Sequence, residues 1–544
     1  MNAVPAAQAA PLLVVRDLAV RFATDSGPVE AVREVGFTLD RGEALALVGE
    51  SGSGKTQSAM ALLGLLADNG RATGTATLAD APLLGQPEHA MRRIRGARIG
   101  VVFQDPMTAL NPYLTIERQM TETLAAHRGQ SRREARAEAL RMLEAVRITD
   151  ARRRLDQYPH ELSGGMRQRV MIAMALACEP ALLIADEPTT ALDVSIQAQI
   201  LELMRDLQQR LGMAILIITH DLGVIAELAD EVVVMYAGKV VEQAPVQALF
   251  DDPQHPYTIS LLASLPRPTE GFETRLPTIP GVAPSLAERP SGCVFADRCP
   301  VALQVCHDEK PALEFIGAGR SVKCHRWREI AEGTLTLDTE PLRAEVSAPP
   351  GGSLALEVSH LHKSYGSPSL LERVGLRRSD VVRAVDDVSF EVRARSTLGL
   401  VGESGSGKTT LARCIIGLTP ADRGDIELLD VPLPADIRSR AREQLRELQM
   451  VFQNPNDALN PYMTVGQTLA RTINRLSSDK LSREALRRRV GELLSAVRLT
   501  AEYAARYPAE LSGGEKQRVA IGRALVANPA RVVPDEPTSS LDVS

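Results

Sequence analysis

The sequence predicts an α/β fold that occurs in two tandem copies, each with a parallel sheet flanked by helices. Three observations support this prediction. Long stretches of the first half recur in the second half, and short apolar runs alternate with longer segments of helical spacing, such as residues 131–146 and 483–497. In both copies a glycine-rich loop also joins an apolar run to a helical segment.

The repeat extends over most of the chain. FQDPMTALNPYLT from Phe103 returns as FQNPNDALNPYMT from Phe452, an offset of 349 residues. ELSGGMRQRV from Glu161 and DEPTTALDVS from Asp186 return with the same offset, so this part of the two copies matches without net insertion. A period this long indicates duplicated domains and not a solenoid of short repeats.

Four regions follow from the repeat and from changes in composition. Residues 1–250 form the first copy, and residues 251–335 form a Pro-rich, irregular extension that contains four cysteines. Residues 336–353, with the run Ala-Pro-Pro-Gly-Gly-Ser, have the composition of a flexible linker. The second copy spans residues 354–544 and is incomplete at its C-terminus.

Charge and hydropathy limit the function classes. The formal net charge is −6, from 62 basic and 68 acidic residues, which gives no electrostatic reason to expect nucleic acid as a partner. The longest apolar runs, such as residues 213–218 and 232–236, are far shorter than a membrane span and indicate buried strands. No basic residue precedes the apolar N-terminal stretch, so we expect no signal peptide and a cytosolic protein.

Two identical loops, VGESGSGKT, carry the clearest chemistry. Residues 49–56 and 402–409 fit the phosphate-loop pattern G-x-x-x-x-G-K-[ST]. We expect the runs before them, residues 44–48 and 397–401, to be strands, and the segments after them to be helices.

Each part of this loop has a chemical purpose. Glycines let the backbone wrap closely around phosphate, and backbone N–H groups at the helix start face the anion. Lys55 and Lys408 would contact the β- and γ-phosphates, and Thr56 and Thr409 would place a hydroxyl on Mg²⁺. The predicted phosphate contacts are Gly49, Ser51, Gly52, Gly54, Lys55 and Thr56 in the first loop and Gly402, Ser404, Gly405, Gly407, Lys408, Thr409 and Thr410 in the second.

An acidic pair follows a second apolar run. In LLIADE (residues 182–187) a predicted strand ends in Asp186, which would hold Mg²⁺, and Glu187 would polarise the attacking water. Asp535 and Glu536 are their counterparts in the second copy.

LSGGM from Leu162 and LSGGE from Leu511 resemble the signature motif of ABC ATPases. Together with the phosphate loops and DEPT, they make the chain similar to two such domains in tandem, each with a mixed sheet core and a helical subdomain. The resemblance implies further roles. Gln104 and Gln453 would contact Mg²⁺ and nucleotide, His220 would be a switch that contacts the γ-phosphate, and Asp193 and Asp542 would be the D-loop positions. Phe22 and Tyr365 would stack on adenine. The residues that would contact the γ-phosphate across the domain pair are Ser163, Gly164, Gly165, Ser512, Gly513 and Gly514.

In such pairs, the resemblance implies, each ATP lies between the phosphate loop of one domain and the signature of the other. The sequence ends at Ser544, before any counterpart of His220, and Pro534 and Arg531 are unusual in a central strand. We therefore expect the stronger site to combine Lys55, Asp186, Glu187 and His220 with the second signature. Either the chain is truncated, which the stop inside a domain favours, or its second site is degenerate.

The four clustered cysteines are Cys293, Cys299, Cys306 and Cys324. Their segment, with HPYT at 255–258 and PGVAPSL at 280–286, resembles the C-terminal extension of oligopeptide and dipeptide importer ATPases. Four thiolates could ligate a [4Fe–4S] cluster, which the resemblance favours, or zinc, or could remain reduced thiols. We expect a cluster in this segment to be structural and not catalytic, and to lie far from the phosphate loops. Cys178 and Cys414 are predicted to be small core residues.

The resemblance implies the ATP-hydrolysing subunit of an importer for oligopeptides, dipeptides or related solutes. It would be peripheral to the cytoplasmic face of the inner membrane, with two permease subunits and an extracytoplasmic binding protein as partners. Nickel, glutathione or an opine are alternative cargoes. A soluble ABC ATPase acting on ribosomes or DNA is the other alternative. The compact intervals between loop and signature, 113 residues from Gly49 to Leu162 and 109 from Gly402 to Leu511, disfavour it.

Overall fold

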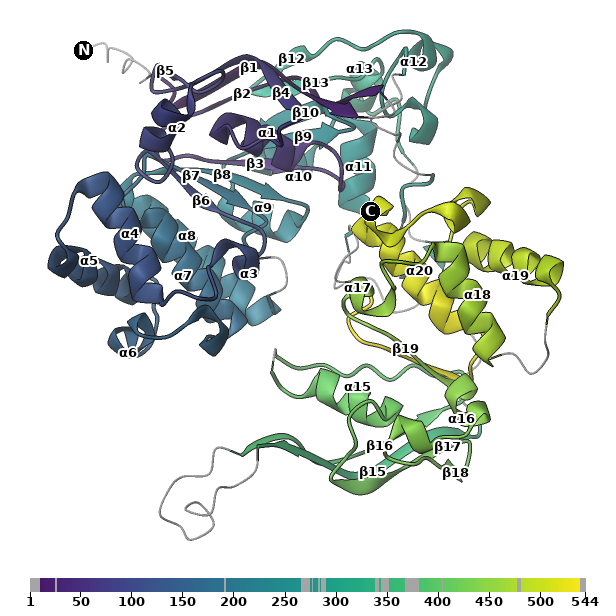
Figure 1. The fold of residues 1–544 in the computed structure, drawn as a ribbon. Helices are drawn as coiled ribbons and strands as arrows, with labels where there is room; N and C mark the ends of the chain where they lie inside the picture. Colours follow the sequence, from purple (N-terminus) through teal and green to yellow (C-terminus); the bar gives the residue numbers. More distant parts are fainter. Residues whose placement is uncertain are drawn as a thin grey trace, which may run out of the picture. The chain divides into compact units, whose positions relative to one another are not determined.

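The computed structural model describes residues 10–24, 27–189, 192–265, 274–275, 277–281, 284, 290–337, 342–343, 352–366, 381–403, 405–476 and 481–538. They belong to two compact units, one within residues 1–344 and the other within residues 345–542 (Figure 1), and each unit is described by itself. None of the helices in the described ranges combines the length and the apolar composition of a membrane span.

An eight-stranded mixed sheet forms the centre of the first unit, in the order β12-β13-β10-β9-β3-β8-β7-β6. Its strands are β3 (Ala44–Val48), β6 (Ile99–Val102), β7 (Leu182–Asp186), β8 (Ala214–Thr219), β9 (Glu231–Tyr236), β10 (Lys239–Pro245), β12 (Glu314–Gly317) and β13 (Arg320–Val322). The five strands from β9 to β6 run parallel. The apolar runs before the first phosphate loop and the first acidic pair are thus buried strands, as the sequence predicts.

Both faces of this sheet are covered at β3, which explains why that strand is apolar at every position. Side chains alternate along β3, so that Ala44, Ala46 and Val48 enter one core while Leu45 and Leu47 enter the other. The first core also contains helical residues, and the second contains the antiparallel sheet described next. A strand packed on both faces has no polar side, because neither face meets water.

The second sheet of this unit is antiparallel, in the order β2-β1-β4-β5. Its strands are β1 (Leu13–Thr24), β2 (Gly27–Leu39), β4 (Gly70–Leu78) and β5 (Ala81–Pro82). Phe22 near the end of β1 pairs with Gly70 at the start of β4, and a Cβ on Gly70 would come within 2.7 Å of the Phe22 ring. The absence of a side chain at Gly70 therefore lets the ring lie against the backbone.

The helices preceding the extension are α1 (Lys55–Leu63), α2 (Glu88–Ile94), α3 (Pro106–Ala109), α4 (Ile116–Arg128), α5 (Arg132–Ala145), α6 (Ala151–Leu155), α7 (Gly164–Leu176), α8 (Val194–Leu211), α9 (Leu222–Leu228) and α10 (Val246–Asp251), with the 3₁₀ turn η1 (Pro159–Glu161). α4, α5 and α6 lie together beside α7 as a helical subdomain (Figure 1). Ser131 and Glu134 form a capping box at the start of α5, which confirms the helix predicted there.

The cysteine-containing extension is part of the first unit. Its elements are α11 (Pro256–Ala263), β11 (Thr274–Arg275), η2 (Ala296–Arg298), α12 (Gln304–Asp308), β12, β13 and α13 (Trp327–Ala331). β11 pairs with β14 (Leu342–Arg343), which lies in the predicted linker. β13 pairs antiparallel with β10, where Val322 lies opposite Glu242, and β12 pairs with β13. The extension therefore continues the central sheet past β10.

The second unit has an antiparallel sheet in the order β16-β15-β17-β18 and a parallel pair, β19 with β20. Its strands are β15 (Leu354–Tyr365), β16 (Val382–Arg393), β17 (Arg423–Leu428), β18 (Val431–Pro432), β19 (Leu448–Val451) and β20 (Arg531–Pro534). Its helices are α15 (Lys408–Ile416), α16 (Arg442–Glu447), α17 (Pro455–Ala458), α18 (Val465–Leu476), α19 (Arg483–Ala496) and α20 (Gly513–Leu525), with 3₁₀ turns η3 (Ile437–Ser439), η4 (Ala501–Ala505) and η5 (Pro508–Glu510). Pro534 is the last residue of β20.

One predicted strand is wrong. Residues 397–401, which correspond to β3, do not form a strand. β3 is held between β8 and β9, whereas no strand pairs with 397–401 in the described part of the second unit. Without neighbours its backbone groups have no ladder to join, and its apolar side chains are exposed, at 49% for Leu398, 50% for Leu400 and 94% for Val401.

Candidate active site

The first phosphate loop connects β3 to α1, and its glycines are required by its geometry. Gly49, Gly52 and Gly54 have φ values of 150°, 78° and 97°. A Cβ on Gly49 would come within 2.1 Å of the carbonyl oxygen of Met235, and one on Gly54 within 2.5 Å of that of Ala31. Only glycine permits this close backbone approach, which turns the loop around the start of α1.

Lys55, the first residue of α1, folds back onto this loop. Its Nζ donates to the carbonyl oxygen of Gly49 at 2.6 Å and to that of Glu50 at 2.9 Å. The side chain is buried, at 6% exposure. A cation is thus held at the centre of a loop whose neighbouring helix start presents N–H groups, an arrangement that attracts phosphate.

Thr56 and Asp186 meet beside Lys55. The Thr56 hydroxyl donates to Asp186 Oδ1 at 3.2 Å, across the gap between α1 and the end of β7. The pKa of the Asp186 carboxyl is raised to about 6, mainly by burial. The Thr56 hydrogen bond and Lys55 lower this pKa, and the charge of Glu187 contributes to raising it. A hydroxyl and a buried carboxylate are oxygen ligands of the kind that Mg²⁺ prefers, with nucleotide phosphates and water completing its shell.

Glu187 brings three predicted residues together. Its Oε2 accepts a hydrogen bond from Gln104 Nε2 at 2.8 Å, and its Oε1 lies 3.0 Å from His220 Nδ1. Gln104, Glu187 and His220 follow β6, β7 and β8, which are adjacent in the sheet. Their convergence follows because the carboxyl ends of parallel strands share one edge, where ligands of α/β sheets bind.

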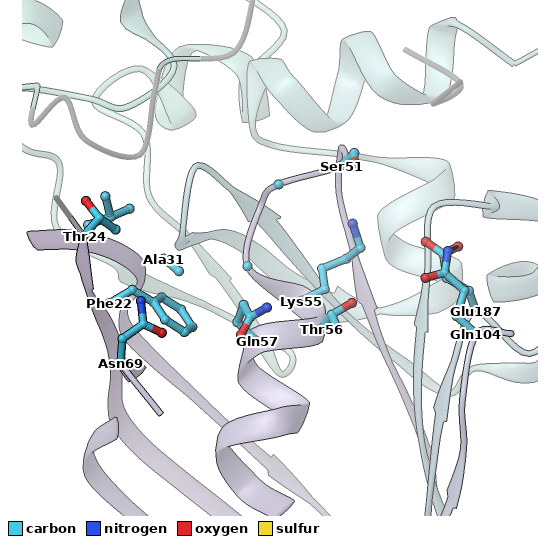
Figure 2. A pocket seen from close by; sticks show the side chains of 13 residues that line it. Phe22, Thr24, Ala31, Ser51, Lys55, Thr56, Gln57, Asn69, Gln104 and Glu187 are labelled. Atoms are coloured by element: carbon cyan, nitrogen blue, oxygen red, sulfur yellow. Dashed lines mark hydrogen bonds between the residues drawn. The ribbon is translucent and has the colours of Figure 1, made fainter. Parts of the chain in front are cut away.

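Gln104 and Glu187 line one pocket of about 520 Å³, together with Lys55 and Thr56. Figure 2 shows Phe22, Thr24 and Asn69 at one end and Gln104 and Glu187 at the other, with Lys55 and Thr56 between them. Among the loop residues, Ser51, Gly52 and Gly54 also line it. The sequence did not reveal the contributions of Thr24, at the end of β1, and Asn69, in the turn before β4, because neither belongs to a motif.

The signature residues start helices in both units, as the sequence predicts. Ser163 caps α7, where its Oγ accepts from Met166 N at 3.3 Å, and Gly164 and Gly165 form the first turn. Ser512 caps α20 in the same way, followed by Gly513 and Gly514. Ser163, Gly164 and Gly165 do not line the pocket of the first unit. Asp193 caps α8, and Asp542 lies outside the described residues.

One residue missed in the sequence links the signature helix to the acidic pair. Gln168 on α7 is buried, and its Nε2 donates to the carbonyl oxygen of Pro188 at 2.5 Å. Gln517 makes the same contact with Pro537, at 2.9 Å. The repetition of this glutamine, in RQRV and in KQRV, could have identified it in the sequence. In both units it links the signature helix directly to the segment after the acidic pair.

The second unit repeats most of this geometry. Lys408 Nζ donates to the carbonyl oxygens of Gly402 at 2.6 Å and Glu403 at 2.8 Å, and Thr409 Oγ1 donates to Asp535 Oδ1 at 3.1 Å.

The second unit also repeats the contact between the glutamine and the acidic pair. Gln453 Nε2 donates to Glu536 Oε2 at 2.5 Å, which repeats the contact between Gln104 and Glu187. Gly405 and Gly407 have φ values of 82° and 98°, and Thr410 lies in the first turn of α15. Tyr365 ends β15 with 44% exposure, and Ser404 lies outside the described residues.

The four cysteines of the extension line one small pocket with His255 and Phe295. Burial raises the pKa of the Cys293 thiol, that of Cys299 to about 11 and that of Cys324 to about 12. In the described ranges, no three His, Cys, Asp or Glu side chains form a group that could hold a metal ion. Cys178 and Cys414 are buried core residues, as predicted.

The segment that contains the cysteines contacts the first phosphate loop, contrary to the expectation that a cluster held there would lie far from it. Arg298, the residue before Cys299, places its Nη1 2.8 Å from the carboxylate of Glu50, inside the first loop. The reason lies in the sheet order, because β13 of the extension pairs with β10, which is two strands from β3. The extension thus folds back to the edge of the sheet where the loop lies.

The raised pKa of Asp186 predicts a pH effect on Mg²⁺-dependent nucleotide binding. Below about pH 6 a proton occupies the carboxyl and competes with the cation, so affinity at the first site is expected to fall about tenfold per pH unit. Without metal, Asp186 affects the free energy of unfolding in the opposite direction. Because its pKa in the folded state is above 3.8, its contribution to stability is most favourable at acid pH and becomes less favourable as the pH rises to about 6. Titration calorimetry between pH 5 and 8 measures this change in nucleotide affinity. Asp186→Asn should remove the part of the pH dependence that comes from protonation of Asp186.

The fold and the phosphate-loop geometry define a tandem P-loop ATPase. Residues 32–190 and 385–539 match the ABC transporter family, and residues 241–306 match the C-terminal region of oligopeptide/dipeptide transporters. The chain belongs to the ABC transporter family, as an ATP-binding protein with two nucleotide-binding domains. The family and the fold class predicted from the sequence are thereby confirmed.

Two named proteins are similar to this chain over nearly all of its length. The chain is 45% identical over 538 residues to the oligopeptide transport ATP-binding protein OppD of Mycobacterium tuberculosis, which covers 98% of this chain and 87% of that protein. It is 42% identical over 539 residues to the glutathione import ATP-binding protein GsiA of Pectobacterium atrosepticum, with coverage of 97% and 78%. A solved dimeric bacterial ABC transporter cassette, MJ0796, is 27% identical, with a TM-score of 0.40 and coverage of 43% of this chain and 98% of that one.

Proposed function

We propose that this ATPase energises the import of oligopeptides, dipeptides or related small solutes. The observation that carries the proposal is the match of residues 241–306, which overlap the extension, to the oligopeptide/dipeptide transporter C-terminal region. The strands of the extension also continue the first ATPase sheet. The relatives named for oligopeptide transport and for glutathione import support the same class of solute. These matches do not favour the ribosome or DNA alternative.

The proposed partners follow from this function. Two membrane permease subunits would receive the motion of the ATPase, and an extracytoplasmic binding protein would deliver the solute. The chain would then act as a peripheral protein on the cytoplasmic face of the membrane. The proposed boundaries remain 1–250 and 354–544 for the ATPase domains, 251–335 for the extension and 336–353 for the linker.

The site residues have proposed roles that fit their geometry. Lys55 and the loop N–H groups would bind the phosphates, and Phe22, at the far end of the pocket, would stack on the base. Thr56, Asp186 and Gln104 would hold Mg²⁺, which would neutralise charge on the phosphates. Glu187 would orient the attacking water and take its proton, with its carboxylate held by Gln104 and His220.

The second unit would bind nucleotide in the same way, through Lys408, Thr409, Asp535, Gln453 and Glu536. The signature residues of each unit would contact the nucleotide held by the other, so that ATP joins the two domains and hydrolysis releases them. The fusion of both domains in one chain would favour this pairing through a high effective concentration.

A [4Fe–4S] cluster is the proposed occupant of the cysteine pocket. Four cysteine thiols facing one apolar pocket are the ligand set of such a cluster, and a cluster needs its ligands further apart than a single ion does. The lack of a compact single-ion group in the described ranges is consistent with that choice over zinc. Iron and acid-labile sulfide would be assayed after anaerobic purification. A zinc content of one per chain without sulfide would refute the cluster.

Reconstitution tests the transport function. In proteoliposomes with the two permease subunits, ATP hydrolysis is expected to increase when the solute-loaded binding protein is added, and solute should accumulate inside. A variant with both Lys55→Ala and Lys408→Ala is the matched control and should show neither effect. Hydrolysis that no membrane partner alters would remove the proposal, and gene neighbours or binding assays on the binding protein would identify the cargo.

A further inference from the structure

Arg298 joins the cysteine segment to the first phosphate loop. Its Nη1 donates to Glu50 Oε2 at 2.8 Å and to the Tyr236 hydroxyl at 3.1 Å. The same guanidinium donates through Nε to the carbonyl oxygen of Pro280 at 2.8 Å and through Nη2 to that of Ile279 at 3.3 Å. The ion pair is buried, with side-chain exposures of 7% for Arg298 and 10% for Glu50. Few surface arginines are fixed by so many partners, so this side chain has one defined position.

Glu50 is held at its backbone as well. Its N–H donates to the Tyr257 hydroxyl at 3.0 Å, and its carbonyl oxygen accepts from Lys55 Nζ at 2.9 Å. Tyr257 is fully buried on α11, in the extension. The second residue of the phosphate loop is therefore anchored twice to the extension, by its side chain and by its backbone.

An aromatic cluster connects these anchors to the cysteines. Phe295 lies with its ring centroid 5.2 Å from that of Tyr236 and 5.4 Å from that of Tyr257. Phe295 also lines the pocket that contains the four cysteines. Any rearrangement of that pocket would move a ring that packs against both tyrosines, because interiors are close-packed.

We propose that Arg298 is a positioning residue, through which the cysteine-containing extension holds the first phosphate loop in the conformation that binds ATP. This inference rests on the proposed role of the Lys55 loop as a nucleotide site. A loop that is already ordered loses less conformational freedom when ATP binds, so the contact raises affinity. Loss of Arg298 leaves a buried carboxylate without its counter-charge, and the loop must shift to hydrate it.

The second loop has the same nine residues without this enclosure. Glu403, the counterpart of Glu50, is exposed, whereas Glu50 is 9% exposed. The sequence of the loop alone therefore does not require the buried setting, and the extension provides it in the first unit.

The test measures ATP affinity of the first loop in the full-length chain. A Lys408→Ala background removes binding at the second loop, and the fluorescent analogue mant-ATP with Mg²⁺ serves as the probe. Arg298→Met is expected to raise Kd about tenfold, and Tyr257→Phe about threefold. Adding Glu50→Gln to Arg298→Met should raise Kd little further, since both changes remove the same contact.

A matched control is available in the same extension. Arg328 forms an ion pair with Glu314 at 2.6 Å, but its side chain is 61% exposed, so Arg328→Gln should leave Kd unchanged. Affinity at the second loop, measured in a Lys55→Ala background, should also be unaffected by Arg298→Met. A change at both loops would instead indicate general unfolding and would overturn a specific positioning role.

Two further outcomes are distinguishable. If Arg298→Met and Tyr257→Phe keep circular dichroism and melting temperature but bind mant-ATP within twofold of the parent, the positioning proposal is wrong. If the Lys55→Ala, Lys408→Ala protein still binds mant-ATP, the assignment of the nucleotide site itself is wrong. Hydrogen exchange of peptides covering residues 49–56 gives an independent readout, with faster exchange expected in Arg298→Met before nucleotide is added.

Discussion

Replacing Glu187 by glutamine is expected to lower ATP turnover at the first site at least a hundredfold while ATP binding is retained. Glutamine has nearly the same shape and can keep hydrogen bonds to Gln104 and His220, which now lie 2.8 and 3.0 Å from the carboxylate. It cannot accept a proton from water, however, and general-base contributions are typically about 10²–10⁴-fold. The expected result is a protein that binds ATP and fails to release it as ADP.

Single-turnover hydrolysis of radiolabelled ATP measures this loss, and gel filtration shows whether intact ATP stays with the chain. Glu536→Gln is the matched change in the second unit, where Glu536 makes the corresponding contact with Gln453. We expect Glu536→Gln to have the smaller effect, because His220 faces only the first of the two carboxylates in the described structure. Normal turnover in Glu187→Gln would show that another group activates the water.

The second large effect is expected from Lys55→Ala. Lys55 is the buried cation at the centre of the loop, and alanine removes both its charge and its hydrogen bonds to the carbonyl oxygens of Gly49 and Glu50. We expect Kd for ATP at the first site to rise about a hundredfold, which corresponds to about 2.7 kcal/mol. Charge-assisted hydrogen bonds to phosphate in a water-poor site are of that size.

Thermal unfolding provides the measurement, because ligand binding stabilises the folded state in proportion to its affinity. ATP with Mg²⁺ should raise the melting temperature of the first domain in the parent chain and in Lys408→Ala, but much less in Lys55→Ala. Lys55→Arg is a useful intermediate, since it keeps the charge while changing the geometry. Equal nucleotide stabilisation of Lys55→Ala and the parent would contradict the role of this lysine.

The phosphate-loop site could be predicted largely from the sequence, and the reason is physical. Gln104, Asp186, Glu187 and His220 each follow a short apolar run, and parallel strands bring their carboxyl ends to one edge. The glycines were equally predictable, since each positive φ in the loop excludes other side chains. Local patterns therefore determine both the elements and the place where they meet.

Other features depend on contacts that no local pattern specifies. Residues 397–401 have the same apolar character as β3 but no described strand beside them, so the sequence predicted a strand that the structure lacks. The ion pair between Arg298 and Glu50 joins residues 248 positions apart and depends on the path of the extension along the sheet. The spacing of the cysteines likewise indicated a cluster, but it contained nothing that placed that cluster beside the loop.

The pairing of β13 with β10 has a consequence for how the molecule can be divided. Without the extension, β10 would end the sheet with unpaired backbone groups at Glu242 and Gln243, next to the apolar pair Val240 and Val241, and such an edge invites association with other chains. A fragment that ends at residue 250 would therefore be prone to aggregate, and Glu50 would lose its contacts with Arg298 and Tyr257. Proteolysis near residue 250 is therefore expected to inactivate the first ATPase domain, and not to release it as an active fragment.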